Sequence, residues 1–228
     1  MSIILQIETA TTVCSVALAK NGETIAVKQL NERNIHAEVI TLYIDELVAN
    51  CGLKYNDIDA IAVSSGPGSY TGLRIGVSTA KGLSFALDKP LIAIETPEAM
   101  AQGMLAAGNI VPGTLLCPMI DARRMEVYTA LFDAQGNVVK PTSAEIIDEH
   151  SFAEQLQTQK ILFFGDGAEK CQAILSSSPN AQFNTDFTNS AKHLSQKAAE
   201  KYAAGLFEDV AYFEPFYLKD FLIAQKKN

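Results

Sequence analysis

Two kinds of segment in the sequence have residue types and spacings that could bind an anion. One is the glycine-rich run GPGSYTGLRIG, from Gly66 to Gly76, which lies between an apolar run and a helical pattern. Free backbone N–H groups at such a strand–loop–helix junction can bind phosphate. The loop has no Lys, and its glycine spacing matches neither common nucleotide-binding glycine motif. A tight turn with Ser69 or Thr71 capping the helix therefore stays the alternative.

The other kind of segment is an acid that ends an apolar run and precedes a short polar turn. Glu8 precedes the turn Thr9–Thr12, and Asp121 precedes Ala122–Arg124. An acid with two neighbouring arginines could hold a phosphate or a metal–phosphate group. A surface turn in which Asp121 forms an ion pair worth at most about 1 kcal/mol is the alternative.

Other reaction chemistry finds no support in the spacing of residues. The three histidines are far apart and form no HExxH or HxxxH pair, and no GxSxG nucleophile motif is present. The four cysteines form no CxxC pair and lie in or beside apolar stretches, as buried thiols of a reducing compartment do. We therefore assign no catalytic residue and no metal ligand.

The order of the predicted elements repeats along the chain and must position these segments. Residues 3–30 predict three strands separated by polar turns, and residues 115–139 predict the same arrangement. A helical segment and an apolar strand ending in glycine follow each set, at residues 35–50 and 58–68 and again at residues 151–157 and 160–167. Each set predicts a mixed sheet flanked by helices.

We predict an α/β duplicated actin-like (ASKHA, RNase H-like) fold made of two similar halves. Glycine and proline cluster in residues 106–114, which places the boundary between residues 1–108 and 109–228. Such folds bind nucleotide in the cleft between the halves, beside the first hairpin turn of each. Residues 190–205 have helical propensity, with Gly205 as the stop, and the aromatic tail that follows should pack on a surface.

Composition restricts the class of protein and of partner. The 228 residues carry a net charge of −8. Residues 1–108 have 7 basic and 11 acidic side chains and residues 109–228 have 11 and 15, so each half has a charge of −4. Strong independent binding to nucleic acid is not expected. No apolar run approaches the roughly 18 residues of a membrane span, and the start has no signal-peptide pattern, so we expect a cytoplasmic protein.

Two helices of the first half have apolar or small surface beyond what a core-facing stripe needs. Gly72, Gly76, Ala80 and Ser84 recur every four residues, and such a ridge of small side chains lets another helix approach closely. The apolar side of the helix at residues 35–50 is wider than the roughly 100° that core packing requires. A protein–protein interface and packing inside the same half are both open interpretations.

Taken together, these segments resemble the TsaB (YeaZ) family of subunits that take part in threonylcarbamoyladenosine formation in tRNA. The resemblance runs along the whole chain, through ILQIETATTVCSVAL, the helix beginning IHAE, GPGSYTGLRIG, ETPEAMA, DARRMEVY and EPFYLK. GPGSYTGLRIG followed by DARRMEVY is the specific part. Glu8 stands where the family usually has Asp, which puts a metal–phosphate geometry there in doubt.

The resemblance implies a subunit without a direct catalytic role. In this family the catalytic paralogue TsaD carries the metal on an HxxxH motif, and the ATPase TsaE joins the pair. The family's TsaD-binding interface corresponds here to residues 35–50 and 70–87, for which we name His36, Val39, Ile40, Tyr43, Leu47, Tyr70, Gly72, Gly76, Ala80 and Ser84. A vestigial nucleotide site would comprise Glu8, Thr9, Thr11, Asp121 and Arg123.

The remaining expectations concern ligands and alternatives. We expect no tightly bound cofactor, with ATP or ADP at the interface of the complex, contact with tRNA only through the complex, a homodimer in the partner's absence, and no membrane. A stand-alone actin-like phosphotransferase or ATPase is the alternative. A peptidase is disfavoured because the sequence has neither its metal motif nor its nucleophile motif.

Overall fold

A computed structural model describes residues 2–108 and 110–219 and contains two five-stranded mixed sheets. The first has the order β3-β2-β1-β4-β5 and the second the order β8-β7-β6-β9-β10, so the predicted repeat of elements is confirmed. In both sheets the first three strands are antiparallel and the last two run parallel to the central one. The strands are β1 Ile3–Glu8, β2 Val13–Lys20, β3 Glu23–Asn31, β4 Ala60–Gly66, β5 Leu91–Glu95, β6 Leu115–Asp121, β7 Glu126–Phe132, β8 Val138–Ile146, β9 Ile161–Phe164 and β10 Ala181–Asn184.

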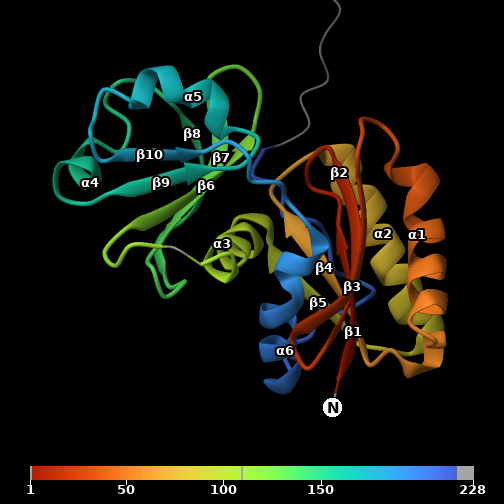
Figure 1. Cartoon of the computed structure of the whole chain (residues 1–228). Helices are drawn as coiled ribbons and strands as arrows, with labels where there is room; N and C mark the ends of the chain where they lie inside the picture. The colour runs from red at the N-terminus through yellow and green to blue at the C-terminus, as the bar shows by residue number, and fades with distance from the viewer. Residues whose placement is uncertain (1, 109, 220–228) are drawn as a thin grey trace, which may run out of the picture.

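Helices cover both faces of the first sheet, with α1 and α2 side by side on one face and α6 on the other (Figure 1). The helices are α1 His36–Asn50, α2 Tyr70–Leu87, α3 Thr96–Ala106, α4 Ala153–Thr158, α5 Ala168–Leu175 and α6 Ser195–Ala203, with the short 3₁₀ helices η1 Tyr55–Asp57 and η2 Ala191–Leu194. The duplicated actin-like (ASKHA, RNase H-like) α/β fold predicted from the sequence is confirmed. Within the described residues, no helix is both long and apolar enough to cross a membrane.

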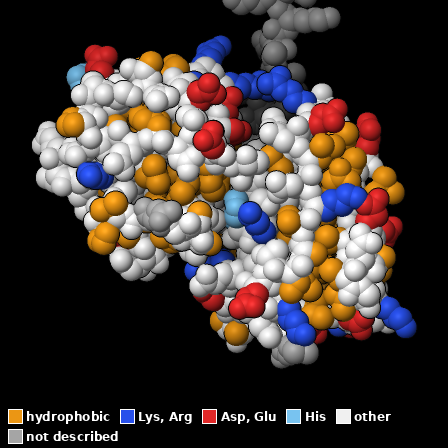
Figure 2. Space-filling model, viewed as in Figure 1, with side chains coloured by type: hydrophobic (Ala, Val, Ile, Leu, Met, Phe, Trp, Pro, Cys, Tyr) orange, Lys and Arg blue, Asp and Glu red, His pale blue; other side chains and the backbone are white. Residues whose placement is uncertain are grey.

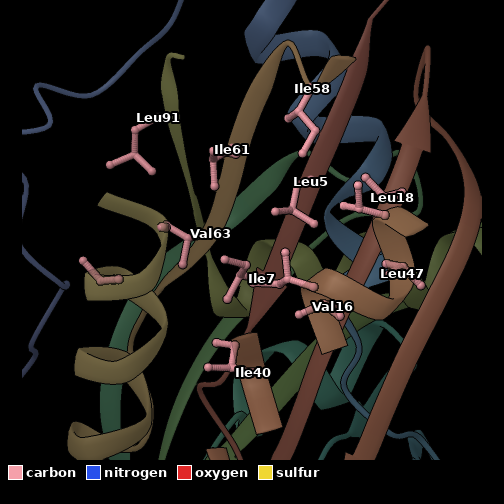
Figure 3. Packing of buried hydrophobic residues seen from close by; sticks show 14 of the residues in the cluster. Leu5, Ile7, Val16, Leu18, Ile40, Leu47, Ile58, Ile61, Val63 and Leu91 are labelled. Atoms are coloured by element: carbon pink, nitrogen blue, oxygen red, sulfur yellow. The ribbon is translucent and has the colours of Figure 1, made fainter. Parts of the chain in front are cut away.

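Both faces of the first sheet carry apolar side chains. Successive side chains of a strand point to opposite faces, so one strand can contribute to two apolar clusters. Leu5 and Ile7 of β1 pack in the cluster under α1 and α2, where Ile40 and Leu47 also lie (Figure 3). Ile4 packs in a separate cluster on the opposite face, beneath η2 and α6. The central strand is thus buried on both sides.

The C-terminal segment returns to the first sheet. Leu194 and Ala198 pack with Ile4 in the cluster under α6. Further along, Glu208 N donates to Leu91 O at 2.9 Å, and Phe216 N donates to Ser65 O at 2.7 Å.

The tail therefore packs on a surface as expected, but on the first sheet, although the predicted division assigned it to residues 109–228. The reason is physical: η2 and α6 cover an apolar face of the first sheet that α1 and α2 cannot reach. Tail residues 220–223 lie outside the described residues.

Candidate functional site

The glycine-rich loop between β4 and α2 is pressed against the turn that follows β1. Ser69 N donates to Ala10 O at 2.7 Å. A Cβ on Gly68 would lie 2.4 Å from Ala10 O, and one on Gly72 would lie 2.1 Å from Thr9 O. The loop's glycines therefore permit this close approach of two backbones. Ser69 Oγ accepts from Gly72 N at 3.2 Å, so Ser69, and not Thr71, caps the helix.

The small-residue ridge of α2 faces inward. A Cβ on Gly76 would lie 2.1 Å from Thr9 Oγ1. Ala80 and Ser84 are buried, and Ala80 belongs to the core cluster beneath the helix. The interpretation that Gly72, Gly76, Ala80 and Ser84 face a partner is therefore wrong. Their four-residue spacing indicates close packing, but it does not say which neighbour packs there. Here Gly72 and Gly76 lie against the chain's own turn after β1, and Ala80 packs in the core of the same half.

Most of the apolar side of α1 also faces its own half. Ile40 and Leu47 are buried in the core, while Val39 and Tyr43 are half-buried and Leu42 is 56% exposed. The extra width of the apolar side thus consists largely of residues at the edge of the core. Ile40 and Leu47 are wrong as interface residues, whereas Val39 and Tyr43 are partly accessible.

His36 links the start of α1 to the turn after β1. Its Nε2 lies 3.0 Å from Thr11 O, and its side chain is buried. The prediction of His36 as an interface residue is wrong, because its buried side chain contacts the turn Thr9–Thr12 of its own half. The turn Thr9–Thr12 is therefore enclosed by α1 on one side and by the glycine loop on the other.

The accessible side of α2 carries Phe85, which the sequence did not single out, and the predicted interface residue Tyr70 lies at the start of the same helix. Phe85 is 84% exposed. Tyr70 is half-buried beside Tyr217 of the tail, with ring centroids 5.0 Å apart, and the Arg74 guanidinium lies 4.3 Å from the centre of the Tyr70 ring. No periodicity marked Phe85, because it is a single apolar residue on the side opposite the small-residue ridge. Figure 2 shows hydrophobic side chains over the N-terminal half, where Figure 1 places α1, α2 and β3.

A small cleft lies between the two halves. Its volume is about 60 Å³, and Figure 2 shows a hollow between the halves with acidic and basic side chains at its rim. Residues from distant parts of the sequence form its walls: Thr11, Thr12, Val13, Asn31 and Met100 from the first half, Gly165 and Asp166 after β9, and Phe187, Thr188 and Asn189. Of the five predicted nucleotide-site residues, only Thr11 lines this cleft.

Glu8 and Thr9 are buried behind the wall of the cleft. Glu8 Oε1 accepts from Ala10 N at 2.6 Å, whereas Glu8 Oε2 and Thr9 Oγ1 have no hydrogen-bond partner among the described residues. Burial raises the pKa of the Glu8 carboxyl to about 7, against the lowering effect of the hydrogen bond from Ala10 N and of the neighbouring polar groups of Ser64, Asn189 and Thr9. Near neutral pH a large fraction of Glu8 is therefore protonated, which does not suit a metal–phosphate ligand.

Asp121 is engaged by its own half. Its Oδ1 accepts from Arg123 N at 2.9 Å and forms an ion pair with Lys170 Nζ. Asp121 N donates to Asp166 Oδ1 at 3.2 Å, which brings Asp166 to the cleft. The ion pair that we offered as the alternative for Asp121 is present, but its partner is Lys170 of α5 and not an arginine of the turn.

Asp166 and Lys170 were not found by sequence reasoning. The segment FGDG at the end of β9 is the counterpart of SSGPG after β4 and could have drawn attention to Asp166. Nothing local links Lys170 to Asp121, 49 residues earlier. Among residues 2–108 and 110–219, no group of three His, Cys, Asp or Glu side chains is placed to hold a metal ion.

Comparison with known proteins agrees with this arrangement. The family model for TsaD, tRNA N6-adenosine threonylcarbamoyltransferase, matches residues 29–220. The chain belongs to this family, in its TsaB (YeaZ) branch. It is 43% identical over 125 residues to the tRNA threonylcarbamoyladenosine biosynthesis protein TsaB of Haemophilus influenzae, covering 55% of this chain and 51% of that protein. The TsaB of Escherichia coli K12 is 38% identical over 134 residues, covering 59% of this chain and 56% of that protein.

The chain therefore spans about half the length of the curated TsaB relatives it matches. The structural match is more complete: a crystal structure of a Pseudomonas aeruginosa protein described as similar to peptidase YeaZ has a TM-score of 0.82 and 25% identity. It covers 96% of this chain and 100% of that one. The TsaB family predicted from GPGSYTGLRIG and DARRMEVY is thus confirmed.

Proposed function

We propose that this chain takes part in threonylcarbamoyladenosine biosynthesis in tRNA as a subunit without a direct catalytic role. It would act with a TsaD-type transferase and with the ATPase TsaE, and it would meet tRNA through that complex. The proposal rests on one observation in this member of the TsaB family. The acids that end β1 and β6, Glu8 and Asp121, both contact groups of the protein itself. Glu8 is buried behind the cleft and Asp121 is paired with Lys170, so both acids serve the fold.

The size of the cleft supports the same proposal. Ligand sites commonly enclose about 300–1,000 Å³, whereas this cleft has a volume of only about 60 Å³. Its lining includes the apolar Val13, Met100 and Phe187 but no Lys or Arg. These features do not favour a stand-alone phosphotransferase. We propose that ATP or ADP, where it binds, does so at the interface with the partner.

The accessible sides of α1 and α2 are the surface that we propose for the partner. Leu42 and Phe85 are exposed apolar side chains there, with Val39 and Tyr43 accessible in part. Exposed aromatic anchors of this kind often dominate binding energy at interfaces. The same surface would pair two copies of the chain when the partner is absent. This assignment keeps the helices named from the sequence but uses their outward sides.

The function is tested by reconstitution. The chain, TsaD and TsaE are purified separately and combined with tRNA, ATP and the threonylcarbamoyl donor, and each protein is omitted in turn. Modification should require all three proteins. The chain alone should neither modify tRNA nor hydrolyse ATP at an enzyme-like rate. Robust turnover by the pure chain that is lost in Asp121→Ala would contradict the non-catalytic role.

The docking surface is tested by Phe85→Asp. Because Phe85 is 84% exposed, the melting temperature should stay within about 2 °C of the parent's. Loss of a central aromatic anchor costs 2 kcal/mol or more, so affinity for the partner should fall at least roughly thirtyfold. Val138→Asp is the matched control, because Val138 is 60% exposed on the second sheet. Equal partner affinity of the two variants would exclude this surface.

A further inference from the structure

The turn between β6 and β7 holds two of the chain's four arginines in an unusual backbone conformation. Arg123 has φ of 70° and Arg124 has φ of 49°, both in the left-handed region. Glycine and asparagine are the residues that adopt this region most readily. The backbone of arginine has no preference for this region. The presence of arginine at both positions is therefore best explained by a role of its side chain.

The turn is fixed by its own hydrogen bonds. Arg123 N donates to Asp121 Oδ1 at 2.9 Å, Glu126 N donates to Arg123 O at 3.1 Å, and Ala122 N donates to Glu126 O at 3.1 Å. Both arginines are exposed, and neither lines the cleft between the halves. The protein thus presents two adjacent guanidinium groups to the outside on a rigid support.

The charges around the turn leave these arginines available. Lys170 is paired with Asp121 and Lys219 with Glu126, which leaves Asp166, whose Oδ1 accepts from Asp121 N, as a third acid beside the turn and the two arginines as a larger positive charge. Lys170 Nζ also donates to Glu126 O at 2.7 Å. The excess positive charge of this region therefore belongs to the arginine pair, although the whole chain carries −8.

We propose that Arg123 and Arg124 bind the phosphodiester backbone of RNA. Guanidinium groups bind phosphate oxygens in a bidentate manner, and phosphate contacts provide most of the sequence-independent affinity for nucleic acid. An external strand of RNA fits the exposed position better than a nucleotide in the cleft, which neither arginine reaches. The inference rests on the proposed function, because it identifies the part of this chain that touches the tRNA within the complex.

The test is the variant Arg123→Asn/Arg124→Asn. Asparagine tolerates the left-handed region, so the variant's melting temperature should equal or exceed the parent's. Binding of fluorescent tRNA is titrated over a range of salt concentrations, for the chain alone at low salt and for its complex with TsaD. Loss of two phosphate contacts should weaken binding roughly tenfold and reduce the slope of log affinity against log salt by about 1.5.

Three further samples separate the causes. Arg123→Lys/Arg124→Lys keeps both charges and should keep the salt slope. Lys20→Gln/Lys54→Gln removes two exposed charges near the start of β1, in the first sheet, whereas the arginines lie beside the second sheet. This variant should leave RNA binding unchanged. Each sample is also tested for pairing with TsaD and for ADP binding, so failure of the proposed function appears as lost pairing in every sample, the parent included.

Several results would overturn the proposal. The first is RNA affinity and salt slope equal to the parent's in the asparagine variant, in the chain alone and in the complex. The second is a lower melting temperature that accompanies the loss, which would make the arginines structural. The third is unchanged RNA binding with lost ADP binding, which would assign the pair to a nucleotide phosphate.

Discussion

Replacing Gly76 with alanine tests whether the small-residue side of α2 packs inside the N-terminal half. The new Cβ would lie 2.1 Å from Thr9 Oγ1 and 3.3 Å from two carbon atoms of the same side chain. Crowding of this kind in a packed core costs about 1–3 kcal/mol. Alanine offsets about 1 kcal/mol of that through its higher helix propensity. The expected net loss of unfolding free energy is therefore up to about 2 kcal/mol.

Thermal unfolding followed by circular dichroism measures this loss. For a chain of this size 1 kcal/mol corresponds to about 2–4 °C, so the melting temperature should fall by up to about 8 °C. Gly82→Ala is the matched control on the same helix, since nothing lies within 4 Å of a Cβ there. Its melting temperature should rise by about 2–4 °C, because only the propensity changes.

A second substitution identifies the cause of the loss. Thr9→Ala removes the crowding oxygen, so Gly76→Ala should cost at least about 1 kcal/mol less in that background, as a double-mutant cycle would report. Gly72→Ala should be harder to rescue, because its Cβ would meet the backbone oxygen of Thr9. Equal melting temperatures for Gly76→Ala and Gly82→Ala, with loss of partner binding in Gly76→Ala alone, would refute the internal packing.

Two further predictions concern pH. The pKa of Glu8 is about 7 in the folded protein against 4.5 for an ordinary carboxyl. The folded protein should therefore lose stability as pH rises from about 4.5 to 7, because the buried carboxyl must then become charged. Glu8→Gln should therefore be more stable than the parent by up to about 3 kcal/mol at pH 8 and similar to it at pH 4, as denaturant titrations at both pH values would show. Burial, with a smaller effect of Lys192, lowers the pKa of His193 to about 4, so stability should be lost as pH falls from about 6.5 to 4. His193→Phe should lessen this acid loss, and an unchanged pH profile of either variant would contradict the corresponding assignment.

The sequence was sufficient to predict the fold because the repeated order of elements is a long-range pattern. Alternating strands, Gly-containing turns and the two glycine-ended strands recur in the same order, and two identical sheet topologies follow. The tail was harder, because no local pattern says which sheet a helix covers. η2 and α6 lie after the second half in sequence, yet their apolar residues match the open face of the first sheet.

The candidate site was only partly predictable, for a related reason. Periodicity identified the ridge Gly72–Ser84 as a surface of close approach, which is correct, but it could not identify the neighbour as Thr9. Phe85 has no periodic partner and gave no signal, although it is the more exposed feature of the same helix. Contacts between residues far apart in sequence, such as Lys170 with Asp121, lie beyond any local pattern.

The turns after β1 and after β6 occupy equivalent positions in the two halves but differ in exposure. The first turn is enclosed by the protein, whereas the second exposes its arginines to a binding partner. The turn after β1 is enclosed, because the long helix α2 approaches it through glycines and His36 of α1 contacts it from the other side. The corresponding helix in the second half, α5, has eight residues, and it reaches the turn after β6 through Lys170. That contact neutralises Asp121 and leaves the arginines facing outward. A residue change that enlarges the first turn should therefore disturb folding, whereas a change at the second turn should affect only what the protein binds.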